Sequence, residues 1–296
     1  MRPSLPVRLA HADRAHRVTF RTLQPPLYAG AFSCYNYAMN PEDQIILVDK
    51  PDGISSFGVV AKVRGYLKAE YGRKIKVGHT GTLDPFATGL LILLSGKMTK
   101  RSNEFLKKDK IYEATLKLGY TSTTGDPEGE IQQFSPNRRT GKGVGTVYPA
   151  EHEDLARAAR SVSEGHAVPT PLPAINTTLQ NFIGTVNQKV PAFSAVKING
   201  ERAYKLARKG LPVDTPTREV EIYSIEILDY HYPELTIRTH VSSGTYIRTL
   251  AEDIGKALGT GAYLTALRRI KIANYDVRNA HPLSDFTANP SRHDII

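Results

Sequence analysis

The chain has 296 residues, enough for one large domain or two ordinary ones, and 40% of them are hydrophobic, so a sizeable core is possible. No apolar run approaches the length of a membrane-spanning helix, and the single cysteine, Cys34, excludes an intrachain disulfide framework and a cysteine-rich metal site. A net charge of +10 is typical of proteins that bind a polyanion such as nucleic acid, although it also serves simple solubility.

Residues 1–38 differ in composition from the rest of the chain. They contain five arginines and one acidic residue, and no helical or strand periodicity is evident. Three interpretations stay open: a disordered arm that touches RNA, an arginine-rich targeting presequence, or translated upstream sequence before a functional start at Met39. We expect a poorly ordered extension, because a well-formed domain, predicted to span residues 39–285, begins directly after it.

The first part of this domain is predicted to contain a strand, a turn and a helix. The apolar run Gln44–Asp49 predicts the strand, and the sequence KPDG at Lys50–Gly53 predicts the turn. Ser55 or Ser56 can cap a helix that runs to about Tyr71, since the apolar residues that follow have the spacing of one helical face.

A glycine-rich loop and a strongly apolar run follow within Lys76–Gly96, KVGHTGTLDPFATGLLILLSG. Asp84 in this loop precedes Pro85, which fixes its own φ and restricts the residue before it. A lone aspartate in a loop is most often a turn residue, so its function depends on the rest of the chain.

The second half is predicted to be regular outside one insertion. Residues 134–173 are rich in Gly, Pro, Ser and charge, which indicates an insertion with weak order inside the domain. We expect a helix over 98–106, a strand over 111–119, an extended segment over 190–198, a short helix over 201–209, antiparallel strands over 219–230 and 235–242, a helix over 245–258, a core-closing segment over 262–275 and a polar tail over 286–296.

Six motifs occur in a fixed order between about residues 39 and 275. They are VDKPDGISS, GHTGTLDPFATGLL, KIYEATLKLG, VPAFSAVKINGERAYKLARKG, SSGTYIRTL and YLTALRRI. In this order they resemble the TruB family of tRNA pseudouridine synthases, which isomerise uridine 55 in the T-loop. The resemblance implies an α+β (mixed α/β) pseudouridine synthase fold with a largely antiparallel central sheet and an active-site cleft.

The resemblance also implies a catalytic set. Asp84 matches the family's catalytic aspartate, which acts on the target nucleotide while the N1–C1′ bond breaks and the C5–C1′ bond forms. Arg248 matches the arginine that pairs with it, and a guanidinium there is expected to lower the pKa of Asp84. Tyr112 matches the tyrosine that stacks on the target base.

Three further residues match positions that handle the uridine. His79 matches the residue that helps evert the base, and Tyr246 and Leu267 match positions that contact it; flipping a base costs about a few kcal/mol. No metal-ligand spacing surrounds His79 and the reaction is an isomerisation, so we expect neither a metal nor an organic cofactor. The basic residues expected to contact RNA phosphates are Lys50, Arg73, Lys74, Lys76, Lys110, Lys197, Arg202, Arg268 and Arg269.

The sequence departs from the family pattern in three places. These are the N-terminal extension, the long 134–173 segment where the family carries an RNA-clamping thumb loop, and the short stretch after Tyr275, from which a full C-terminal PUA domain is expected to be missing. We expect a cytoplasmic monomer that acts on the tRNA T-arm with no membrane or obligate protein partner. The alternatives are a tRNA-folding chaperone with little turnover and a guide-RNA-dependent relative.

Overall fold

The computed structural model describes residues 42–135, 170–198 and 200–287, which belong to one unit, Asn40–Ile296. The predicted extension, most of the 134–173 insertion and most of the tail lie outside these residues, so the corresponding boundaries stay predictions. Within the described residues, no helix is both long enough and apolar enough to cross a membrane.

A mixed sheet dominates the described residues, and ten strands take part in it. Eight strands follow the path β14-β1-β3-β12-β4-β11-β10-β7, with β2 paired to β3 and β13 paired to β12. The strands are β1 (Ile45–Lys50), β2 (Val77–His79), β3 (Thr88–Ser95), β4 (Lys110–Leu118), β7 (Gly184–Lys189), β10 (Thr217–His231), β11 (Glu234–Val241), β12 (Ala262–Ile272), β13 (Tyr275–Asp276) and β14 (His281–Pro282).

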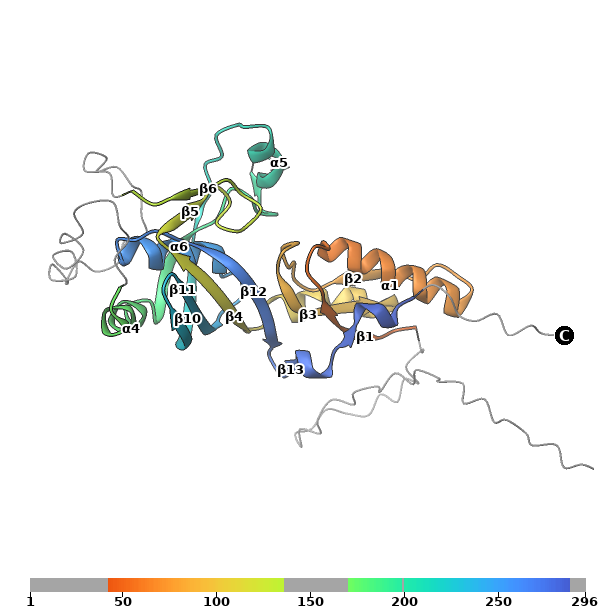
Figure 1. The fold of residues 1–296 in the computed structure, drawn as a ribbon. Coiled ribbons are helices and arrows are strands. Elements are labelled where there is room, and N and C mark those ends of the chain that lie inside the picture. The colour runs from red at the N-terminus through yellow and green to blue at the C-terminus, as the bar shows by residue number, and fades with distance from the viewer. Residues whose placement is uncertain (1–41, 136–169, 199, 288–296) are drawn as a thin grey trace, which may run out of the picture. The chain divides into compact units, whose positions relative to one another are not determined.

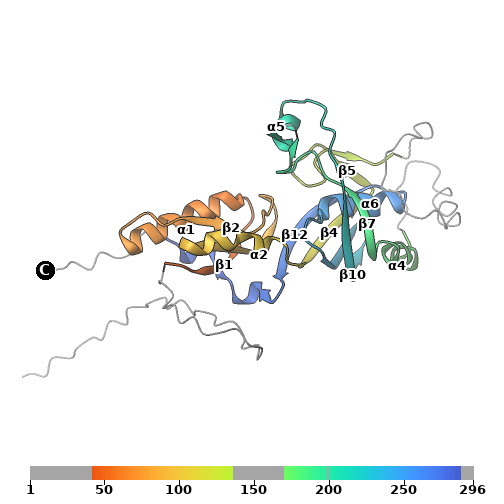
Figure 2. The same ribbon diagram turned by 180° about the vertical axis from the view of Figure 1, so that it is seen from behind.

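Helices and two small hairpins complete the described fold. The helices are α1 (Ser56–Tyr71), α2 (Ser102–Leu106), α4 (Leu172–Gln180), α5 (Ala203–Arg208) and α6 (Ile247–Ala257). The hairpins pair β5 (Tyr120–Ser122) with β6 (Ile131–Gln133), and β8 (Lys197–Ile198) with β9 (Glu201–Arg202). In both views α1 lies beside β1–β3 (Figures 1 and 2), and α6 packs against β12, β4 and β7.

The prediction of a largely antiparallel mixed sheet is confirmed. Only the two-residue pairings of β1 with β14 and of β3 with β12 are parallel among the described strands. The expected pair at 219–230 and 235–242 is observed as β10 and β11. The expected helix over 98–106 is instead a 3₁₀ segment, Gly96–Arg101, followed by the single turn α2.

β12 joins the two halves of the sheet, because it pairs with β3 along one edge and with β4 along the other. At the junction Gly89 has φ +99°, and a Cβ there would lie 2.3 Å from the carbonyl oxygen of Arg269. Only glycine permits this approach of one backbone to the other. The loop between β2 and β3, which carries Asp84, is thereby held against β12.

Helix α1 forms for the reasons that the sequence indicated. The Ser55 hydroxyl accepts a hydrogen bond from the Gly58 amide at 3.0 Å, and Gly72 ends the helix in the left-handed conformation. The apolar stripe that includes Val59, Val63 and Leu67 is buried. Packing of this stripe fixes the start of α1 beside the Asp84 loop.

Candidate active site

The Asp84 loop is attached to the start of α1 at several points. The Ser56 hydroxyl donates to the Leu83 carbonyl at 2.9 Å and accepts from the Leu83 amide at 2.8 Å. The Gly53 amide donates to the Pro85 carbonyl at 3.0 Å, and the Ala87 amide donates to that of Asp84 at 3.1 Å. The position of the carboxylate is therefore set by hydrogen bonds to the backbone before Asp84, at Leu83, and after it, at Pro85.

Lys50 adds a further attachment and is not a phosphate contact. Its side chain is fully buried, and its ammonium donates to the carbonyl oxygens of Pro51, Ile54 and Pro85 at 2.7–2.8 Å. Burial lowers the pKa of Lys50 to about 8, against the opposing pull of nearby carboxylates. The prediction that Lys50 contacts RNA is wrong, because its three protons already have acceptors inside the protein.

Arg248 contacts Asp84 directly. The Arg248 Nε lies 3.1 Å from Asp84 Oδ2, with the arginine side chain 6% and the aspartate side chain 34% exposed. The other guanidinium nitrogens are also occupied: Nη1 donates to the Thr124 carbonyl at 3.0 Å and Nη2 to the Phe193 carbonyl at 2.8 Å. A planar guanidinium with fixed contacts at all three nitrogens can present Nε to the carboxylate in one orientation.

Asp126 is part of this arrangement and was missed at the level of sequence. Its Oδ2 lies 3.1 Å from Arg248 Nη1, and its side chain is 3% exposed. The Thr124 hydroxyl and the Glu128 amide both donate to Oδ1, at 2.5 and 3.1 Å. The available signal was local, because TGDPEG places an aspartate before a proline in a glycine-containing turn, as in the Asp84 loop.

The pKa of Asp84 is set by opposing influences, of which burial is the largest. Burial raises it above its ordinary value, and the negative charge of Asp126 raises it further. The positive charge of Arg248 lowers the pKa, as expected, and the charges of Lys50 and Arg269 lower it less. The effect of burial is larger than that of these charges. The expected effect of Arg248 on the pKa of Asp84 is therefore confirmed, and burial makes the net shift upward.

Tyr112 and Leu267 lie together on the buried side of the sheet. Both belong to one hydrophobic cluster that also contains Leu83, the residue before Asp84. They come from the adjacent strands β4 and β12, where Leu267 pairs with Ala114 and Arg269 with Tyr112. An aromatic and an aliphatic side chain thus belong to the core cluster that also holds the residue before the candidate carboxylate.

Tyr246 and His79 occupy the ends of two elements. Tyr246 precedes α6, and the side chain of Gln188 bonds both its amide, at 2.7 Å, and its carbonyl, at 3.0 Å. His79 ends β2, where its Nδ1 accepts from the Gly81 amide at 3.4 Å. Burial, and then the charge of Arg269, lower the pKa of His79, which favours the neutral imidazole.

The basic residues predicted to contact phosphates fall into two groups. Arg269 is buried and donates to the carbonyls of Leu90 and Gly81 at 2.8 and 3.1 Å. Lys110 is buried and donates to the carbonyls of Leu106, at 3.1 Å, and Lys108, and burial lowers its pKa to about 8. The predictions for Arg269 and Lys110 are therefore wrong, since both cations bond backbone oxygens inside the protein.

The remaining predicted cations are on or near the surface. Arg268 forms a two-point ion pair with Asp49, with contacts of 2.7 and 3.1 Å. Arg73, also exposed, pairs with Glu42. The side chains that are exposed and remain candidates for phosphate contact are Lys74, Lys76, Lys197 and Arg202.

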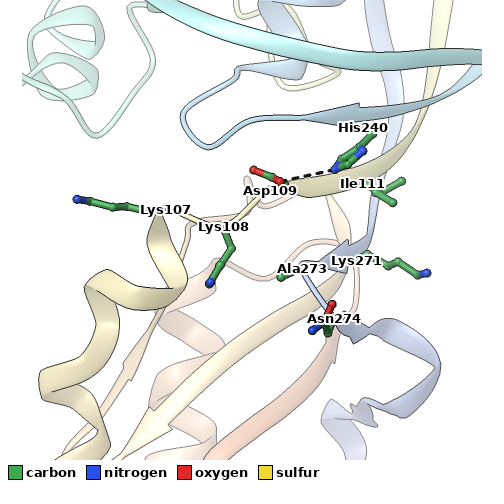
Figure 3. Close-up of a pocket in the computed structure, with 8 residues that line it drawn as sticks. All are labelled: Lys107, Lys108, Asp109, Ile111, His240, Lys271, Ala273 and Asn274. Atoms are coloured by element: carbon green, nitrogen blue, oxygen red, sulfur yellow. Dashed lines mark ion pairs between the residues drawn. The ribbon is translucent and has the colours of Figure 1, made fainter. Parts of the chain in front are cut away.

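A cavity of about 610 Å³ lies elsewhere, on the sheet face opposite Tyr112. Ile111, His240 and Lys271 line it from neighbouring registers of β4, β11 and β12 (Figure 3). The amines of Lys107 and Lys271 extend to opposite sides in Figure 3, so these cations do not converge on one ligand. Among the described residues, no group of three or more His, Cys, Asp or Glu side chains could hold a metal ion.

Two family models match the chain. The model described as TruB family pseudouridylate synthase (N terminal domain) matches residues 67–150 and 150–247. The model described as tRNA pseudouridylate synthase B C-terminal domain matches residues 248–293. Together they cover most of the chain, including Asp84, Asp126 and Arg248.

Relatives named tRNA pseudouridine synthase B are similar over nearly the whole described domain. The one from Phocaeicola vulgatus is 41% identical over 246 residues, which are 83% of this chain and 92% of that protein. The one from Flavobacterium johnsoniae is 39% identical over 254 residues, 84% of this chain and 98% of that protein. The one from Neisseria meningitidis is 40% identical over 246 residues, 83% and 69% of the two chains.

Solved structures share the fold. A chain in the crystal structure of a Cbf5-Nop10-Gar1 complex matches with a TM-score of 0.56 and 26% identity over 82% of this chain. A chain in an H/ACA RNP bound to a substrate RNA containing 2'-deoxyuridine matches with a TM-score of 0.52 and 24% identity over 84% of this chain. The chain spans 53% and 59% of those two proteins.

Proposed function

The chain belongs to the TruB family of pseudouridylate synthases, and we propose that it isomerises uridine 55 in the T-loop of tRNA, with Asp84 as the catalytic carboxylate. The relatives' shared name, tRNA pseudouridine synthase B, supports tRNA as the substrate. The observation that carries the role of Asp84 is its 3.1 Å contact with an arginine whose other nitrogens are all held by the protein.

The reaction needs a carboxylate at the glycosidic bond. The N1–C1′ bond breaks, the uracil turns, C5 bonds to C1′, and the proton on C5 is replaced by one on N1. Asp84 either bonds transiently to C1′ or C6 or assists departure of the base, and every one of these routes uses its ionised form. Arg248 favours that form, which offsets part of the effect of burial. Substrate and product have the same composition, so the equation balances with no further reactant.

The neighbouring side chains provide the surroundings that the base requires. Tyr112 supplies an aromatic face for the uracil and an oxygen for the C5 proton, while Leu267 and Tyr246 enclose the uridine. The neutral His79 is suited to take the place of the flipped base in the T-loop stack, because an uncharged ring is cheaper to desolvate there than an imidazolium. The exposed Lys74, Lys76, Lys197 and Arg202 are the candidates for phosphate contacts.

Release of tritium from C5-labelled uridine in a T-arm RNA tests this function. The isolated wild-type chain should release tritium, and Asp84→Asn should abolish release while leaving the dissociation constant for RNA nearly unchanged. Asp84→Asn keeps the size of the side chain, so a loss of activity cannot be assigned to a cavity. Tight RNA binding by the wild type without any release would instead identify an RNA-binding chaperone or a protein that needs a guide RNA and partners.

A further inference from the structure

Phe57 is the most exposed large hydrophobic side chain in the described part of the chain, at 66%. It lies in the first turn of α1 between the buried Ser56 and Gly58. Single exposed hydrophobic residues are ordinary on protein surfaces and need no explanation by themselves. The position of Phe57 relative to the candidate active site makes this one informative.

The side chain of the residue before Phe57 is hydrogen-bonded to the backbone of the residue before Asp84. Ser56, which precedes Phe57, exchanges two hydrogen bonds of 2.8 and 2.9 Å with Leu83, which precedes Asp84. The turn before α1 is also attached, through Gly53, to the carbonyl of Pro85 at 3.0 Å. The exposed ring therefore stands at the rim of the loop that carries the candidate carboxylate.

The ring is presented by a rigid element. Helix α1 has 16 residues, and its first turn is capped by the Ser55 hydroxyl, which accepts from the Gly58 amide at 3.0 Å. A side chain on a capped, packed helix loses little conformational freedom when a ligand covers it. No ring contact joins Phe57 to another aromatic residue in the described ranges, and two thirds of its surface is exposed, so ring surface is available to a ligand.

Unpaired loop bases are the chemical group that such a ring fits. His79 is proposed to fill the gap that the flipped uridine leaves, and the unpaired bases beside that gap have further faces that a protein ring can cover. Single-stranded RNA bases are recognised by stacking on exposed aromatic side chains, independently of which base is present. We propose that Phe57 is a substrate-binding residue whose ring stacks on an unpaired nucleobase beside the flipped uridine; this inference rests on the proposed function.

The test separates stacking from general hydrophobic contact. Phe57→Ala should raise the dissociation constant for a T-arm RNA about tenfold, because losing one base–aromatic stack costs about 1–3 kcal/mol. The single-turnover rate at saturating RNA and the melting temperature should stay unchanged. Phe57→Tyr should restore binding, whereas Phe57→Leu, which keeps an apolar side chain without a π face, should not.

The absence of tryptophan from the chain allows a direct probe. Phe57→Trp introduces a single tryptophan, which can be excited separately from the tyrosines, and stacking on a base should quench its emission when T-arm RNA is added. Tyr223→Trp is the matched control, because Tyr223 on β10 is an aromatic residue with 39% exposure. Its ring centroid lies 4.6 Å from that of His240, at a tilt of 48°, and His240 lines the cavity on the other face of the sheet. Its emission should not change with RNA, and Tyr223→Ala should bind RNA as the wild type does.

The outcomes distinguish this inference from the proposed function. If the wild type converts T-arm RNA but Phe57→Ala binds it equally well and Phe57→Trp is not quenched, the stacking role is overturned while the enzyme assignment stands. Equal binding by Phe57→Leu and wild type would also overturn it, in favour of plain apolar contact. A wild type that neither binds nor converts T-arm RNA would overturn both.

Discussion

Arg248 and Asp126 form an ion pair of 3.1 Å in which the two side chains are only 6% and 3% exposed. Asp126 thereby balances the charge of a buried guanidinium whose Nε remains directed at Asp84. A buried ion pair is weak evidence for stability, because desolvation offsets its attraction, but removing one partner leaves an uncompensated charge. This pair accounts for how Arg248 can be both buried and positioned.

Asp126→Ala should therefore be strongly destabilising. Loss of one member of a buried pair costs about 3–5 kcal/mol, and the free energy of unfolding should fall by that order, together with most of the turnover. Asp126→Asn keeps the shape and should lose less stability. Urea unfolding and tritium release measure the two effects.

A control for Asp126 is available on the surface. Asp229 pairs with His231, and both side chains are largely exposed, so Asp229→Ala should leave unfolding and turnover unchanged. If Asp126→Ala unfolds at the same urea concentration as Asp229→Ala, Asp126 is not the buried counter-charge of Arg248.

The pH dependence of turnover should report the raised pKa of Asp84. Because the ionised carboxylate is the active form in the proposed mechanism, the single-turnover rate should fall on acidification, with a midpoint above the ordinary value of 3.8. Asp126→Asn removes a negative neighbour that disfavours ionisation of Asp84, so its midpoint should lie at a lower pH than that of the wild type. An unchanged or higher midpoint in this variant would contradict the assignment.

The salt dependence of RNA binding should distinguish a surface lysine from a buried one. The logarithm of the binding constant K falls as the logarithm of salt concentration rises. Lys76→Ala should make this negative slope shallower by roughly 0.7–0.9 if Lys76 contacts one phosphate. Lys50→Met should leave the slope unchanged, because the Lys50 ammonium bonds three carbonyls inside the protein. It should instead lower the free energy of unfolding by about 1–3 kcal/mol, since those carbonyls lose their donor. Equal slopes for Lys50→Met and Lys76→Ala would show that the ammonium of Lys50 reaches RNA.

Removing the Ser194 hydroxyl, unlike the substitutions of Asp126 and Lys50, should not destabilise the protein. Its hydroxyl is buried and has no hydrogen-bond partner among the described residues, although the neighbouring Phe193 carbonyl accepts from Arg248. An unsatisfied buried hydroxyl costs free energy, so Ser194→Ala should keep or raise the melting temperature of the RNA-free protein. A clear drop in melting temperature would mean that the hydroxyl has a partner in solution. Thermal unfolding without and with T-arm RNA makes the measurement.

Much of the fold could be predicted, because its signals are local. The cap at Ser55 and the apolar stripe of α1 predicted that helix, and alternation together with a turn predicted the β10–β11 pair. The region around Gly96–Leu106 was less predictable, since one apolar pattern suits an α-helix and a 3₁₀ segment followed by a single turn. The motifs around Asp84 and Arg248 also indicated that these residues belong to one site, and the structure places them 3.1 Å apart.

The sequence by itself determined the main elements, because they depend on residue types at a fixed spacing along the chain. Its motifs, taken in order, indicated the family, and the resemblance implied the pairing of Asp84 with Arg248. Only the tertiary structure decided which charged residues face water. Lys50, Lys110 and Arg269 are cations like Lys76, yet all three are buried. Lys50 and Arg269 bond carbonyl oxygens of the distant residues Pro85 and Gly81, and Lys110 bonds that of Leu106. The tertiary structure also decided the direction in which the pKa of Asp84 shifts and the pairing of Asp126 with Arg248. Burial and charge balance depend on neighbours in space, which spacing along the chain does not specify.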